Sequence, residues 1–125
     1  MIKEDLYFIG WESEVFGFGY GTGENRILPS LVLFMKTVPL EGTYDYEELE
    51  RKVGSVVAWM FINALCKADN IEYGSSPRYG WLTDSGKRLQ KYILSKSEDE
   101  LYELVMTDFK TYEEIEPKDN LFLHD

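Results

Sequence analysis

The sequence is poor in the residue types that build metal centres and nucleophilic active sites. Among its 125 residues there is one cysteine, Cys66, and one histidine, His124. A single cysteine cannot form an internal disulfide, and metal sites made of histidine and cysteine clusters need more of these residues. A serine or cysteine nucleophile would have only His124, next to the C-terminus, as its base. These shortages favour a non-enzymatic protein without a metal or a cofactor.

Long apolar segments are also missing. The best candidate, residues 27–38, is interrupted by Pro29 and Lys36 and is shorter than the roughly 18 residues that span a bilayer. Residues 1–5 lack the basic and then apolar layout of a signal peptide. We therefore expect a cytoplasmic protein with no membrane contact. The apolar content of 44% is enough for one modest core.

Basic residues are few, and the formal net charge is −10. Residues 1–43 hold six acids and three bases, residues 44–95 hold seven of each, and residues 97–125 hold ten acids and two bases. DNA binding depends on lysine and arginine at phosphates, so a chain this acidic is at a disadvantage for it unless a local basic patch exists.

The N-terminal part of the chain combines aromatic residues with glycines. Five aromatic residues in the segment 6–18 favour one or two β-strands over a helix. Glycine then alternates with other residues over 17–23, at a spacing that fits neither the dinucleotide fingerprint nor the P-loop. One interpretation of this run is a bent strand or tight turn. The other is a loop that presents Phe18 and Tyr20 to a protein partner.

Helical spacing and capping residues mark the middle of the chain. Apolar residues between 27 and 38 follow a helical period, and Pro39 ends that helix. Asp45 is the expected N-cap of a short helix over 46–53. Gly54 fits the left-handed residue that closes this helix before the next one begins.

The next helix is expected to run from about residue 55 to Asp69. Its residues 56–66 are apolar except for Asn63. Two strands follow, over 71–73 and 79–82, and the glycine, serine and proline residues between them indicate a hairpin loop. Thr83 then caps a helix to about residue 95, and an acidic helix over about 97–109 follows.

The order of these elements, together with the sequence Leu82-Thr83-Asp84-Ser85-Gly86-Lys87-Arg88-Leu89, resembles a winged helix-turn-helix of the MarR-like type. Residues 45–50 look like the first motif helix and residues 53–55 like the turn. Three apolar residues match inward positions of the second motif helix: Ala58, Ile62 and Leu65. The resemblance implies an α+β fold and, by family habit, DNA binding through the second motif helix.

We therefore expect one globular α+β unit built around a winged helix-turn-helix domain. Its parts are an N-terminal β and glycine-aromatic extension over residues 1–25, the winged-helix domain over residues 26–95, and an acidic C-terminal helix and tail over residues 96–125. The resemblance has no counterpart for the first and last of these parts. Fold alone does not establish function, so the function has to be inferred from the exposed residues.

The second motif helix has few residues that read bases. Two registers fit its pattern. The outward residues of the first register are Trp59, Ile62, Asn63 and Cys66, and those of the second are Trp59, Met60, Asn63 and Lys67. Either face is apolar, whereas a DNA-reading helix exposes several polar and cationic side chains. Either the N-terminal segment or the tail covers this face, or the face binds a partner through Trp59, Ile62 and Asn63.

Four cations lie on the wing and on the helix after it: Arg78, Lys87, Arg88 and Lys91. Together they would suit contacts with a phosphate backbone or with an acidic protein. The alternative is ordinary charge pairing with neighbouring acids or with the acidic tail. The tail would in that case cover the basic group.

These patterns predict a non-enzymatic winged-helix interaction protein that binds a protein partner or associates with itself as a homodimer. Its acidity would suit a cationic, nucleic-acid-binding surface on the partner, as in small phage-type inhibitors that mimic the charge of DNA. The alternative is a dimeric, DNA-binding transcriptional regulator that contacts the backbone through the four cations of the wing region.

Overall fold

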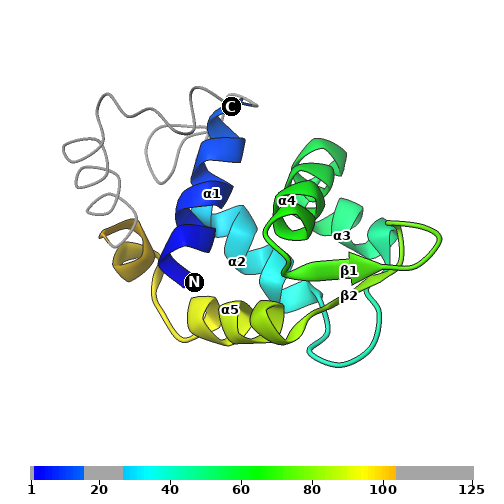
Figure 1. Ribbon diagram of the computed structural model, residues 1–125. Helices are drawn as coiled ribbons and strands as arrows, with labels where there is room; N and C mark the ends of the chain where they lie inside the picture. The colour runs from blue at the N-terminus through cyan, green and yellow to red at the C-terminus, as the bar shows by residue number, and fades with distance from the viewer. Residues whose placement is uncertain (1, 16–26, 104–125) are drawn as a thin grey trace, which may run out of the picture.

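The computed structural model describes residues 2–15 and 27–103, which form a mixed α+β structure of helices around one small antiparallel sheet (Figure 1). The sequence-based expectation of an α+β fold is confirmed at this level. The described elements, in chain order, are α1 (Ile2–Val15), α2 (Leu28–Thr37), α3 (Tyr46–Val53), α4 (Ser55–Lys67), β1 (Ile71–Tyr73), β2 (Gly80–Leu82) and α5 (Asp84–Leu94). Within the described residues, no helix combines the length and the hydropathy of a membrane span.

The N-terminal segment is a helix, so the prediction of strands over residues 6–18 is wrong for residues 6–15. Leu6 and Ile9, three positions apart, are both 1% exposed and pack into the core, and Gly10 is buried beside them. Helical spacing and tertiary packing thus outweigh the β-propensity of the aromatic residues, because that propensity depends strongly on context. The glycine-rich run over 17–23 lies outside the described residues.

The predicted helices α2, α3, α4 and α5 are present, and α3 and α5 begin at the expected capping residues. The side chain of Asp45 accepts a hydrogen bond of 3.0 Å from the backbone N–H of Glu47, and the Thr83 hydroxyl accepts one of 3.1 Å from Gly86. Gly54 has a φ of 90° and a ψ of 159°. This positive φ favours glycine, but the ψ differs from the left-handed helical value that we expected. One residue therefore both ends α3 and begins α4.

The hairpin pairs Ile71 with Leu82 and Tyr73 with Gly80 across the two strands. A third backbone segment runs along the other side of β2. There the Tyr44 N–H donates to the Gly80 carbonyl over 2.8 Å. Two residues later, the Tyr46 N–H donates to the Arg78 carbonyl over 2.9 Å. The chain that enters α3 is thus fixed to the hairpin before the helix begins.

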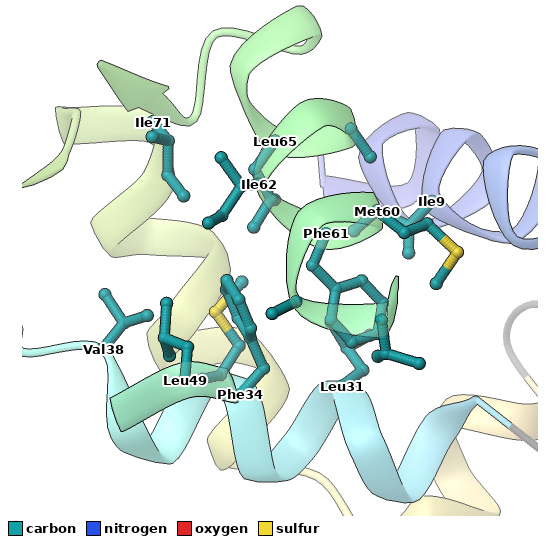
Figure 2. Packing of buried hydrophobic residues seen from close by; sticks show 14 of the residues in the cluster. Ile9, Leu31, Phe34, Val38, Leu49, Met60, Phe61, Ile62, Leu65 and Ile71 are labelled. Atoms are coloured by element: carbon teal, nitrogen blue, oxygen red, sulfur yellow. The ribbon is translucent and has the colours of Figure 1, made fainter. Parts of the chain in front are cut away.

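Helix α4 lies at the centre of the core. Its buried residues are Val57, Ala58, Met60, Phe61, Ile62, Ala64 and Leu65. Figure 2 shows Phe61 packed against Phe34 of α2, with ring centroids 5.2 Å apart in an edge-to-face arrangement. Each such side chain contributes about 1.5–3 kcal/mol when it is fully buried. The helix is therefore held mainly by packing on several sides rather than on one face.

Helix α1 supplies the cover on one side of α4. Figure 2 places Ile9 of α1 beside Met60 of α4. Farther along α1, the carboxylate of Glu12 lies 3.5 Å from the Lys67 ammonium, and the Glu12 residue is only 8% exposed. A carboxylate this buried needs a cation nearby. The ion pair with Lys67 therefore contributes to holding α1 against this side of α4.

The acidic segment after α5 begins as a helix over residues 98–103, with a reciprocal capping box. The Ser97 hydroxyl accepts from the Glu100 N–H over 3.1 Å, and the Glu100 carboxylate accepts from the Ser97 N–H over 2.8 Å. This backbone hydrogen bond holds the pKa of Glu100 below its usual value. Leu101 is buried in the core, and the remainder of the predicted helix, to about residue 109, lies outside the described residues.

Candidate functional site

The β-hairpin exposes an unusual number of aromatic residues for its length. Tyr73 is 44% exposed, Tyr79 is 52% exposed and Trp81 is 37% exposed. We call these three residues, together with the exposed Glu72 opposite Trp81, the hairpin surface. Successive side chains of a strand point to opposite faces, so Trp81 and Glu72 lie on one face of the hairpin and Tyr73 on the other. Exposed tyrosine and tryptophan side chains are enriched where proteins bind other proteins, because they supply large contact areas at little entropic cost.

A stack of three side chains fixes the loop end of the hairpin to the helices. The Arg78 guanidinium lies 4.8 Å from the centre of the Tyr46 ring, and this ring is stacked on Trp59 with centroids 4.3 Å apart. The Arg78 guanidinium also lies 3.5 Å from the carboxylate of Glu47. Beside the stack, the Tyr44 hydroxyl donates a hydrogen bond of 2.7 Å to the carbonyl of residue 77. The hairpin surface is thus presented on a fixed support.

The outward face of α4 differs from both predicted registers. Asn63, outward in both registers, and Lys67, outward in the second, are exposed. Trp59, which both registers place outside, is half-buried. The expectation that Ile62 faces a partner is wrong, since this residue is 1% exposed and packs into the core. Met60 is also buried, because α1 covers that side of the helix. What remains outside is a narrow stripe of α4 in which Val56, Asn63 and Lys67 are exposed and Trp59 and Cys66 are half-buried.

The four cations of the predicted basic group do not form one cluster. Arg78 is held by Glu47 and its aromatic partner, and the Lys87 ammonium lies 3.1 Å from the carboxylate of Glu41, which precedes α3. Arg88 and Lys91 are exposed on α5. In Figure 1 the hairpin loop, which contains Arg78, and α5, which contains the other three cations, extend in opposite directions from β2.

Other residues that drew attention in the sequence have no catalytic setting in the described part of the chain. Cys66 is half-buried, and burial raises the pKa of its thiol, which keeps the sulfur protonated and a poor nucleophile at neutral pH. Within residues 2–15 and 27–103, no group of three or more histidine, cysteine or acidic side chains is arranged to hold a metal ion. Phe18, Tyr20 and His124 lie outside these ranges.

Two residues that organise this site have no clear local signal of that role in the sequence. Tyr46 was assigned only to a helix, although its ring joins Arg78 to Trp59. Tyr73 was assigned only to a strand, and its exposure depends on how the hairpin sits on the body. The signal that was available is the cluster of aromatic residues on both sides of the hairpin loop.

Comparisons with protein-family models, with curated proteins and with solved structures found no match to this chain.

Proposed function

We propose that residues 28–94 form a winged helix and that the chain is a non-enzymatic interaction protein. The order of helix, paired segment, two helices, hairpin and helix supports the winged-helix assignment. So does the backbone before α3, since Tyr44 donates to Gly80 of β2 and Tyr46 to Arg78 just before it, as a third strand of a small sheet would. In such a domain the hairpin would be the wing, and α4 would be the second motif helix.

The observation that carries the proposed function is the composition of the hairpin surface. Three aromatic residues are exposed there, whereas the one cation of the hairpin, Arg78, already contacts Glu47 and Tyr46. An aromatic surface with few available cations suits a protein partner, because charged groups other than arginine are depleted at the centres of protein interfaces. It suits DNA less well, because phosphate binding requires cations that are available for it.

The net charge of −10 adds a preference for a cationic partner. A nucleic-acid-binding protein has such a surface, so the chain would act as an acidic inhibitor of nucleic-acid-binding machinery by occupying it. A second copy of this chain is the other partner considered, although two copies with this charge repel each other at low salt.

DNA binding by the chain itself is the weaker alternative. It would rest on Arg88 and Lys91 of α5, which form no ion pair with the described residues. The outward stripe of α4 offers Asn63 as a base-reading side chain, while Lys67 is engaged by Glu12. Two backbone cations and one amide would give weak binding with a shallow dependence on salt.

Photocrosslinking in the native host tests the proposal. A photoreactive phenylalanine analogue would replace Tyr79 in one variant and Leu94 in a matched control, since Leu94 is also exposed, at 41%, but lies on α5. We expect a discrete protein adduct from position 79 and none from position 94. Adducts of equal yield at both positions, or a nucleic-acid adduct at position 79, would contradict the proposal. A mass of twice 14.6 kDa would identify self-association.

A further inference from the structure

We propose that Trp81 and Glu72 form a binding site for an arginine side chain of the protein partner. This inference rests on the proposed function, since it names the chemical group that the hairpin surface recognises. The two residues lie opposite each other, Glu72 on β1 and Trp81 on β2.

The two side chains are neighbours on the outer face of the hairpin. The next pair along the strands, Ile71 and Leu82, is 2% and 3% exposed and faces the core. Because successive side chains of a strand point to opposite faces, Glu72 and Trp81 point away from the core, and both are exposed. Residues directly opposite each other have Cβ atoms about 4.5–5.5 Å apart, so one bound side chain can contact both.

The outer face carries negative charge that the described cations leave unpaired. Glu72 forms no ion pair with the described residues. On the segment along the other side of β2, Asp45 is exposed between the buried residues Tyr44 and Tyr46. By the same alternation Asp45 points to the outer face, and it too forms no ion pair within the described ranges. A site on this face therefore attracts a cation.

The same charge disfavours a purely apolar occupant. If apolar groups of a partner covered Trp81, they would also displace water from the Glu72 carboxylate beside it. A carboxylate that loses water without gaining a cation or a hydrogen-bond donor is strongly destabilised. A partner therefore gains the contact area of the indole only if it brings a positively charged donor to Glu72.

Arg78 shows how an arginine uses such a pair of groups. Its guanidinium lies 4.8 Å from the centre of the Tyr46 ring and 3.5 Å from the carboxylate of Glu47. A planar guanidinium can place its face on a ring while its N–H groups reach a carboxylate, whereas a lysine ammonium is a strongly hydrated point charge. Trp81 and Glu72 also offer a ring and a carboxylate, and no cation of the described residues lies over this ring. Arginine is therefore the side chain that fits best.

The test is a titration of the full-length, isotope-labelled protein with blocked synthetic peptides, followed by NMR of the indole N–H signals. The peptides alternate glycine with arginine, with lysine, or with citrulline, which has the shape of arginine without its charge. We expect the arginine peptide to shift the Trp81 indole signal and to bind roughly two- to fivefold more tightly than the lysine peptide, and the citrulline peptide to bind most weakly. Equal binding of the arginine and lysine peptides, or no shift of the Trp81 signal, would overturn the inference.

Three variants separate the ring from the carboxylate. Trp81→Leu should bind the arginine and lysine peptides equally, because the ring that distinguishes them is gone. Glu72→Gln should weaken binding of both peptides by roughly two- to fivefold. Glu48→Gln removes the same charge from an exposed position on α3 and should weaken binding by less than about twofold. A preference for arginine that persists in Trp81→Leu, or equal losses in the two glutamine variants, would overturn the inference. If Trp81→Leu does not fold, the two glutamine variants decide the question.

The outcome is distinguishable from failure of the proposed function. A protein adduct at position 79 without any response of the Trp81 indole to the arginine peptide would leave the interaction protein in place and remove the arginine site. A response of the indole to the arginine peptide without any adduct would do the reverse.

Discussion

Gly86 lies directly against the backbone carbonyl of Asn70, where no side chain fits. A Cβ at Gly86 would overlap the Asn70 carbonyl oxygen and lie 2.9 Å from the carbonyl carbon. The same junction is tied by the Thr83 hydroxyl, which donates to the Asp69 carbonyl over 2.7 Å, and by the Ser85 hydroxyl, which donates to the Asn70 side chain over 2.8 Å. The leucine-threonine-to-glycine pattern thus has a structural cause, because it docks the start of α5 on the end of α4.

This contact predicts a large effect of a small substitution. Gly86→Ala should lower the free energy of unfolding by about 3 kcal/mol, because the obstacle is a backbone carbonyl that cannot rotate away. Gly74→Ala is the matched control. A Cβ there meets nothing within 4 Å, so a change within about 0.5 kcal/mol is expected. Chemical denaturation of both variants makes the comparison, and equal effects would contradict the account of the junction.

Trp59 supports the hairpin, because its ring stacks on Tyr46 and Tyr46 contacts Arg78 of the hairpin loop. Trp59→Ala should lower the free energy of unfolding by about 2 kcal/mol, since a half-buried ring and its contact with Tyr46 are lost. Val56→Ala, at a position that is 56% exposed on the same helix, should change it by less than about 0.5 kcal/mol. If Trp59→Ala leaves stability, oligomeric state and partner binding unchanged, the stack has no supporting role.

Asp5 gives the docking of α1 a predictable pH dependence. Burial raises the pKa of this carboxyl, so the folded protein holds the proton at a higher pH than the unfolded chain does. Stability from the protonated form is lost as pH rises from about 4, the unfolded value, through the folded pKa. Asp5→Asn should therefore raise the unfolding midpoint at pH 7, with the difference closing near pH 3. A difference that grows as the pH falls would reverse the sign and refute the burial effect.

The dispersed cations predict weak binding to polyanions. The native chain should pass through a heparin column at low salt, because Arg78 and Lys87 are engaged by Glu47 and Glu41 and the net charge is negative. Retention, followed by its loss in an Arg88→Ala variant, would instead favour the DNA-binding regulator.

Local signals were sufficient for the elements from α2 to α5. Asp45 and Thr83 cap the helices that were expected to follow them, and the glycine, serine and proline residues between β1 and β2 form the hairpin loop. The helix α1 could not be predicted in the same way. Its aromatic residues have high β-propensity. The helix is stabilised by packing against one side of α4, and this contact is known only from the three-dimensional structure.

The residue types of the site can be predicted from the sequence, but their arrangement in space cannot. The sequence indicates that α4 has few side chains that read bases, and it holds aromatic residues on both sides of the hairpin loop. It could not place Ile62 in the core, because two helical registers fitted equally well and the deciding contacts come from several other helices. It also could not show that Glu41 and Glu47 engage two of the four cations, since these pairs join residues far apart in the chain.

Affinity capture from the native host, with and without nuclease, tests whether the hairpin surface binds a protein. The native chain would be compared with a variant carrying both Tyr79→Ala and Trp81→Ala, and with Leu94→Ala as the control for an exposed residue elsewhere. We predict a protein partner that survives nuclease, remains with Leu94→Ala and is lost from the double variant. Capture that disappears with nuclease, or that the double variant leaves unchanged, would contradict the account.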